Sequence, residues 1–152
     1  QDARREVAVD FGADVVVDPT EEDPVERIRE ATGRGVDVAF EAVGHGGTTL
    51  RQAVESTRAG GHTTIIGVFG GSVDFEPQNL VRRQRTVRGS TSHQLGPRIG
   101  EVYGVVLRHL ASGALDAEKY VTSRIDLEDV VEDGFEALQD PEREERKILV
   151  CP

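Results

Sequence analysis

Cysteine, methionine, tryptophan and lysine are scarce or absent in this sequence of 152 residues. It has one cysteine, Cys151, no methionine and no tryptophan, and arginine supplies all but two of its 18 basic residues. A single cysteine excludes a disulfide framework within the chain and favours a cytoplasmic setting. No apolar run approaches the ~20 residues of a membrane-spanning helix. The opening, Gln1 to Arg5, is no secretory leader and lacks a start methionine, so we expect an excised or truncated chain.

The balance of charge is acidic, with 28 acidic residues and a formal net charge of −10. This excess argues against nucleic acid or an anionic membrane as a partner. Hydrophobic residues make up 37% of the chain, which is enough for one domain with a packed core. The carboxylates between Asp126 and Glu145 indicate a solvated helix face rather than a cation site.

The first half of the sequence alternates helical and extended patterns. Helices are predicted over residues 4–11, 24–32 and 48–58, and strands over residues 15–17, 36–40 and 63–68. Pro24 suits the first turn of its helix, and Gly12 and Gly33 suit helix ends. Alternation through short loops predicts βαβ units and a parallel sheet, hence an α/β fold.

The second half is less regular. A short helix over residues 79–84 and a strand over 86–89 precede a longer helix over 99–111. A strand over 121–125, a helix over 127–138 and a strand over 147–150 follow. We expect the long helix to turn these side chains inward: Val102, Val105, Val106 and Leu110.

The residues that follow three predicted strands carry the candidate binding groups, because a parallel sheet binds ligands beyond the carboxyl ends of its strands. They are residues 41–44, 67–70 and 89–92. Their glycines would let a flat ligand approach the backbone, although glycines that merely end strands would look the same. Residues 44–49 mimic a phosphate-binding glycine turn. We reject them as the pyrophosphate loop because Thr49 stands at the third glycine position.

Neither metal ligands nor a catalytic nucleophile can be identified from the sequence. Four histidines, at positions 45, 62, 93 and 109, do not pair with Cys151 or with one another at metal-ligand spacing. No segment resembles a nucleophile elbow. The sequence therefore predicts no catalytic residue and no metal site in this chain.

The order of these segments resembles the zinc-type medium-chain dehydrogenases. Residues 4–19, 32–44, 58–68 and 86–90 resemble the third to sixth strand regions of that family, and residues 134–138 and 147–150 resemble its C-terminal helix and strand. Residues 40–44 and the Gly89–Ser90 pair are most similar to the sorbitol, threonine and butanediol dehydrogenases.

This resemblance implies an α/β fold with a partial Rossmann-type parallel sheet over residues 1–97 that lacks its first strands. Residues 98–152 would form a linking helix and a tail that packs on a GroES-like catalytic domain. That domain, its zinc ligands and the G-x-G-x-x-G turn would precede Gln1. The implied activity is hydride transfer between a secondary alcohol or polyol and NAD, or NADP, in a cytoplasmic homodimer or homotetramer joined around residues 89–111. The isolated chain is expected to be inactive.

The resemblance also assigns cofactor contacts to residues at the strand ends. On the adenine side they are Ala42, Val43, Gly44 and His45. On the nicotinamide side they are Ile66, Gly67 and Val68 under the ring, with backbone groups of Ser90 and Ser92 on the carboxamide.

Two arginines complete the implied cofactor contacts. Arg4 would contact the adenosine ribose and Arg146 the pyrophosphate, which suits a guanidinium. An exposed arginine at a helix start and a surface ion pair with neighbouring glutamates explain these two positions equally simply.

Two other functions remain open. A zinc-free quinone or enoyl-type reductase shares this cofactor domain, and a non-catalytic dinucleotide-binding module would need no further residues. The upstream sequence would discriminate them, since a cysteine and a histidine placed to bind zinc favour the alcohol dehydrogenase.

Overall fold

The computed structural model describes residues 2–91, 99–140, 143 and 145–152. They fall into two compact units, one of Ala8–Gln94 and one of Gln1–Val7 with Leu95–Pro152. The positions of the parts relative to one another are not determined, so each unit is described by itself. The domain boundary after residue 97 stays a prediction. Within the described residues, no helix is long and apolar enough to cross a membrane.

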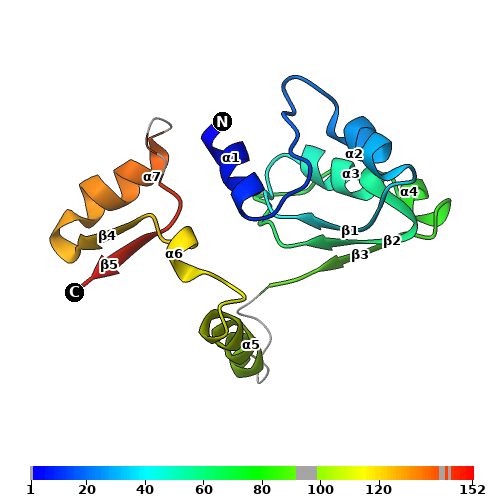
Figure 1. Ribbon diagram of the computed structural model, residues 1–152. Helices are drawn as coiled ribbons and strands as arrows, with labels where there is room; N and C mark the ends of the chain where they lie inside the picture. The colour runs from blue at the N-terminus through cyan, green and yellow to red at the C-terminus, as the bar shows by residue number, and fades with distance from the viewer. Residues whose placement is uncertain (1, 92–98, 141–142, 144) are drawn as a thin grey trace. The chain divides into compact units, whose positions relative to one another are not determined.

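The first unit is built on a parallel sheet of three strands in the order β1-β2-β3. The strands are β1 (Val36–Glu41), β2 (Thr57–Ile65) and β3 (Thr86–Gly89), and the helices are α2 (Pro24–Thr32), α3 (Thr48–Ser56) and the short α4 (Gln78–Val81). Figure 1 shows α2 and α3 above one face of the sheet. The predicted parallel α/β arrangement is confirmed in this unit.

Local sequence explains where α2 begins and ends. The carboxylate of Asp23 accepts hydrogen bonds from the backbone N–H groups of Val25 and Glu26 at 2.8 and 3.1 Å, which caps the first turn. Pro24 lacks the N–H that the first turn would leave unpaired. Gly33 ends the helix with φ of 71°, a left-handed conformation that favours glycine.

The core of this unit is small. Val25 of α2 and Leu50 and Val54 of α3 are its buried apolar side chains. Thr57, Thr63 and Thr64 of β2 are buried with them. Leu50 and Val54 belong to the apolar face of α3, which packs on the sheet.

Helix α3 runs into β2 with no loop between Ser56 and Thr57. Two arginines satisfy the carbonyls at this junction, because Arg29 Nη2 donates to the carbonyl oxygen of Glu55 at 3.0 Å and Arg85 Nη2 donates to those of Glu55 and Thr57. Burial lowers the pKa of Arg85, and the charges of Arg83 and Arg29 lower it further.

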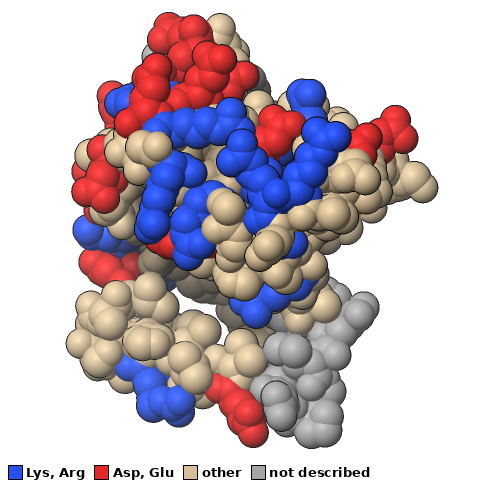
Figure 2. Space-filling model, turned by 90° about the vertical axis from the view of Figure 1, so that its right-hand side faces the viewer, with Lys and Arg blue, Asp and Glu red and all other residues tan. Residues whose placement is uncertain are grey.

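Basic side chains gather on the face of the molecule shown in Figure 2, although the chain as a whole is acidic.

Two predicted strands differ from the structure. Residues 15–17 do not form a strand, because no strand among the described residues pairs with them and a β-branched run cannot form a ladder alone. The strand predicted over residues 63–68 runs instead from Thr57 to Ile65, with a shift in register between Val36 and Val38. Ile66, Gly67 and Val68 therefore follow the strand rather than belong to it.

The second unit carries a smaller parallel sheet. Its elements are α5 (Ile99–Ala111), α6 (Ala117–Tyr120), β4 (Ser123–Asp126), the helical turns η2 (Leu127–Asp129), η3 (Val130–Glu136) and α7 (Ala137–Gln139), and β5 (Ile148–Cys151). β4 and β5 pair in parallel, and η3 packs against them through the buried Gly134. Helix α1 (Asp2–Asp10) spans the division between the two units.

The inward face predicted for α5 is wrong in this structure. Val102, Val105 and Val106 remain 39–43% exposed. Their helical spacing forms an apolar stripe, but the described elements of the same unit leave it exposed. An apolar stripe indicates burial against something, and the sequence alone does not say against what.

Candidate cofactor-binding site

Three loops leave the carboxyl ends of β1, β2 and β3 side by side. The register places Glu41 opposite Ile65 and Ile65 opposite Gly89, so the strands end level with one another. Backbone hydrogen bonds continue past the strand ends. The N–H of Ile66 donates to the carbonyl of Glu41 at 2.7 Å, and the N–H of Ser90 donates to the carbonyl of Ile65 at 2.8 Å. The loops thus start from one continuous, ordered edge.

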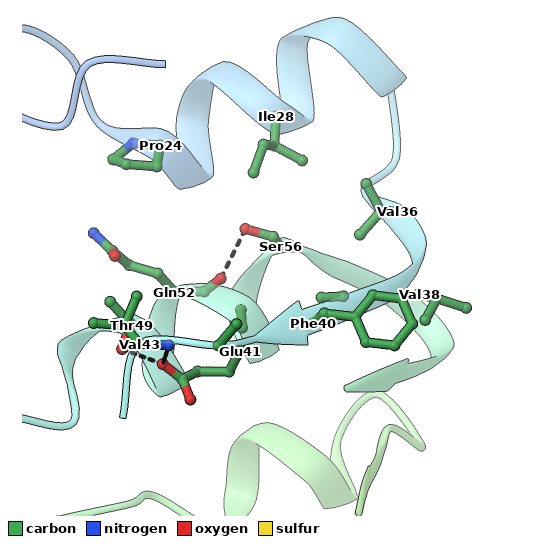
Figure 3. Close-up of a pocket in the computed structure, with 13 residues that line it drawn as sticks. Pro24, Ile28, Val36, Val38, Phe40, Glu41, Val43, Thr49, Gln52 and Ser56 are labelled. Carbon is green, nitrogen blue, oxygen red and sulfur yellow. Dashed lines mark hydrogen bonds between the residues drawn. The ribbon is translucent and has the colours of Figure 1, made fainter. Parts of the chain in front are cut away.

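Glu41 ends β1, an outer strand of the three, and the residue is only 2% exposed. Its Oε1 accepts three hydrogen bonds: from the backbone N–H of Val43 at 3.0 Å, from that of Gly44 at 2.9 Å and from the Thr49 hydroxyl at 2.8 Å. Figure 3 shows Val43 and Thr49 converging on this carboxylate. Burial is the largest effect and raises its pKa, but the hydrogen bonds together outweigh burial, so the pKa of Glu41 is lowered.

The β1 and β2 loops touch through glycine. Gly44 has φ of 72°, and a Cβ added there would overlap the backbone of Val68. A Cβ added to Gly67 would overlap the backbone of Gly44 and the Oε2 atom of Glu41. Backbone packed this closely admits no side chain, so these two glycines are required by the contact between the loops.

Apolar side chains project from the same edge into solvent. Val43 is 65%, Ile66 49% and Val68 87% exposed. Exposed apolar side chains at the end of a parallel sheet can pack on the faces of flat rings, such as those of a dinucleotide. The exposed side chains suit such a ligand. The glycines do not act as predicted, because Gly44 is buried and the space beside Gly44 and Gly67 is occupied by the neighbouring loop rather than open to a ligand.

Two hollows border this edge. One, of about 250 Å³, lies between residues 44–46 and residues 69–73. The other, of about 370 Å³, lies between α2, α3 and β1, as Figure 3 shows with Pro24 and Ile28 on one side and Val36, Val38 and Phe40 on the other. Phe40 is 64% exposed, and among the described strands β1 pairs only with β2, so this hollow opens at a sheet edge.

The structure brings most of the predicted contact residues to this one edge. They are Ala42, Val43, Gly44, His45, Ile66, Gly67, Val68 and Ser90. The Ser90 N–H already donates to Ile65, so only its carbonyl and hydroxyl are available for the predicted contact with a carboxamide. Ser92 lies outside the described residues.

Arg4 and Arg146 belong to the other unit, so their predicted contacts stay predictions. The side chain of Arg4 is exposed on α1. The N–H of Arg146 donates to Thr122 Oγ1 at 3.1 Å. Beside it, hydrogen bonds from Ser123 and then Thr122 lower the pKa of Glu145, which places a charged carboxylate next to Arg146.

Glu41 is among the strand-end residues 41–44 that the sequence predicts as binding groups, but the role of its side chain and that of Thr49 are not predicted by the sequence. A carboxylate that ends a strand is usually solvated. Thr49 enters the sequence pattern only at the position where a phosphate-binding turn over residues 44–49 would have its third glycine. One signal could have found them: a glutamate at a strand end with a glycine three residues later and a threonine in the first turn of the next helix. Within the part of the chain that is described, no group of three or more histidine, cysteine, aspartate or glutamate side chains could hold a metal ion.

Comparison with known proteins identifies the family of this chain. Residues 1–112 match the family model described as zinc-binding dehydrogenase. Among curated proteins, (R,R)-butanediol dehydrogenase of Bacillus subtilis (strain 168) is 38% identical over 150 residues, 98% of this chain and 41% of the relative. L-threonine 3-dehydrogenase of Pyrococcus abyssi (strain GE5 / Orsay) is 34% identical over 140 residues, 91% of this chain and 39% of the relative.

Solved structures agree with this family assignment. The crystal structure of 2R,3R-butanediol dehydrogenase from Bacillus subtilis has a TM-score of 0.88 and 37% identity, and the match covers this whole chain and 42% of that one. A protein described as a zinc-binding dehydrogenase of Sinorhizobium meliloti 1021, solved bound to NADP, has a TM-score of 0.83 and 32% identity, with 100% and 43% covered. The chain spans about two fifths of the length of these relatives, and it belongs to the zinc-binding dehydrogenase family.

Proposed function

We propose that the protein containing this chain transfers a hydride between a secondary alcohol or polyol and NAD(P), and that this chain positions the cofactor. The observation that carries the proposal is the level edge of three strand ends, from which exposed apolar side chains face outward. The names of the relatives, butanediol, threonine and sorbitol dehydrogenases, support the reaction class.

Each loop has a distinct role in this proposal. Residues 42–45, after β1, line the adenine side, and residues 66–68, after β2, lie under the nicotinamide. The chemistry that the cofactor supplies when bound is the acceptance and donation of a hydride. Val43, Ile66 and Val68 exclude water from the rings that they cover, and the Ser90 carbonyl accepts a hydrogen bond from the carboxamide. We lean to NAD rather than NADP.

Zinc does not fit the described residues, which offer no cluster of metal ligands. No step of the reaction is therefore assigned to a metal in this chain. In the proposal, any zinc and the proton relay belong to the part of the protein that this chain does not span.

The decisive experiment uses the full-length protein. It is assayed with butane-2,3-diol, L-threonine and sorbitol, each with NAD and with NADP, by the absorbance of the reduced nicotinamide, before and after treatment with a zinc chelator. Turnover that is lost on chelation and restored by zinc supports the proposal. Turnover that the chelator leaves intact, on a quinone or an enoyl compound instead, would favour a zinc-free reductase. Binding of NADH without any turnover would favour a non-catalytic module.

We also propose that the full protein is a cytoplasmic homodimer or homotetramer. The exposed valines of α5 support an assembly through residues 89–111, since an apolar stripe of this kind is seldom left in water. Sedimentation of the full-length protein tests this, and a monomer at micromolar concentration would contradict it.

A further inference from the structure

Glu41 connects the two loops that face a dinucleotide in the proposed function. Its side chain holds the first loop, through the N–H groups of Val43 and Gly44. Its main chain holds the second loop, because its carbonyl accepts from the N–H groups of Ile66 at 2.7 Å and Gly67 at 3.0 Å. One residue therefore sets the start of both loops.

The second carboxylate oxygen adds a contact between the same two loops. Oε2 is buried and has no hydrogen-bond partner among the described atoms. It lies against Gly67, where an added Cβ would come within 2.5 Å of it. The carboxylate thus packs between the loop after β1 and the loop after β2, and fills the space that the glycine leaves.

The charge of Glu41 is maintained by geometry rather than by a cationic partner. No ion pair involving it is found in the described part of the chain, and three donors converge on Oε1 instead. Hydrogen bonds to a charged acceptor are about twice as strong as those between neutral groups. A neutral amide of the same shape would hold the first loop less firmly, while the backbone bonds to the second loop would remain.

We propose that Glu41 is a positioning residue for cofactor binding, one that fixes the adenine-side loop relative to the nicotinamide-side loop. This inference rests on the proposed function, because it assumes that a dinucleotide bridges the two loops. Thr49 assists it as the side-chain donor from the first turn of α3. A ligand that touches both loops depends on their spacing, whereas a ligand that touches one loop does not.

The experiment therefore compares two ligands on the full-length protein by calorimetric titration. NADH bridges both loops, and reduced nicotinamide mononucleotide occupies the nicotinamide side alone, where the main-chain bonds of Glu41 remain in the variant; NADPH replaces NADH if the protein prefers NADP. We expect Glu41→Gln to raise the Kd of NADH about tenfold, which corresponds to about 1.4 kcal/mol, and to change the Kd of the mononucleotide less than about twofold. Glu30→Gln makes the same chemical change on the exposed face of α2 and should alter neither value.

A pair of variants at Thr49 provides a second measurement. Thr49→Val removes one of the three donors to Oε1 and should weaken NADH about threefold while leaving the nicotinamide mononucleotide unchanged, since two of the three hydrogen bonds to the charged acceptor remain. Thr49→Ser keeps the hydroxyl and should restore wild-type affinity. This pair of variants tests the positioning role of Glu41 even if Glu41→Gln fails to fold.

The outcomes separate the two proposals. If the wild-type protein binds neither NADH nor NADPH, the proposed function fails. If it binds the dinucleotide but the Glu41 variant weakens NADH and the nicotinamide mononucleotide by the same factor, or neither, Glu41 is merely structural and the positioning role is overturned. Equal affinities for Thr49→Val and Thr49→Ser would overturn it as well.

Discussion

The contact between the β1 and β2 loops can be tested by adding a single methyl group. Gly44→Ala introduces two penalties: a left-handed alanine, which costs about 1–2 kcal/mol, and an overlap with the backbone of Val68, which costs about 1–3 kcal/mol as overpacking. Gly46→Ala is the matched control, because Gly46 has a φ of 71° and no atom within 4 Å of the added Cβ. It therefore incurs the first penalty alone.

The difference between the two variants isolates the overlap. At a slope of about 2 kcal/mol per molar urea, the urea midpoint of Gly44→Ala should lie about 0.5–1.5 M below that of Gly46→Ala. Gly67→Ala adds a further check, because no left-handed φ is recorded there and its Cβ meets Gly44 and Glu41. Its loss should be close to the overlap penalty alone. Coincident midpoints for Gly44→Ala and Gly46→Ala would refute the close approach of the two loops.

Three further outcomes are expected. The folded state lowers the pKa of Glu41, so the charged carboxylate stabilises the fold fully above its unfolded pKa of about 4.3. This stabilisation is lost as the pH falls from there through the folded pKa. The urea midpoints of wild type and Glu41→Gln should therefore converge in acid, and a gap that stays constant with pH would contradict this. Ser90→Pro removes the N–H that donates to Ile65 and should lower the urea midpoint, whereas Ser90→Ala should not. The isolated chain should reduce no NAD when alcohol is added. It should also associate through Val38 and Phe40, which are exposed on the edge strand β1. A monomer in sedimentation that melts cooperatively in calorimetry would count against this association.

The helices and the parallel pairing could be predicted because their signals are local. Pro24 and Gly33 define α2 in sequence as they do in the structure. β-branched runs and glycine ends likewise located β1 and β3. These features depend on neighbours within a few residues, so the pattern alone is sufficient for them.

The predictions that failed depend on distant partners. The strand over residues 15–17 needs a neighbouring strand, and the valines of α5 need a covering surface, neither of which the described chain provides. The role of the Glu41 side chain could not be predicted, for a related reason. Its role follows from burial and from three donors that only the fold brings together, and a carboxylate in a sequence has no mark of burial.

The junction between α3 and β2 has a mechanical consequence for the site. Arg29 and Arg85 clamp the carboxyl end of α3, and with no loop before β2 that end has little freedom to move. Thr49, six residues from Glu55 and so about 9 Å away along the helix axis at 1.5 Å per residue, lies near the opposite end of the same helix beside Glu41. The two arginines therefore hold in place the helix that presents the Thr49 hydroxyl to the site, although neither of them contacts the site residues described above.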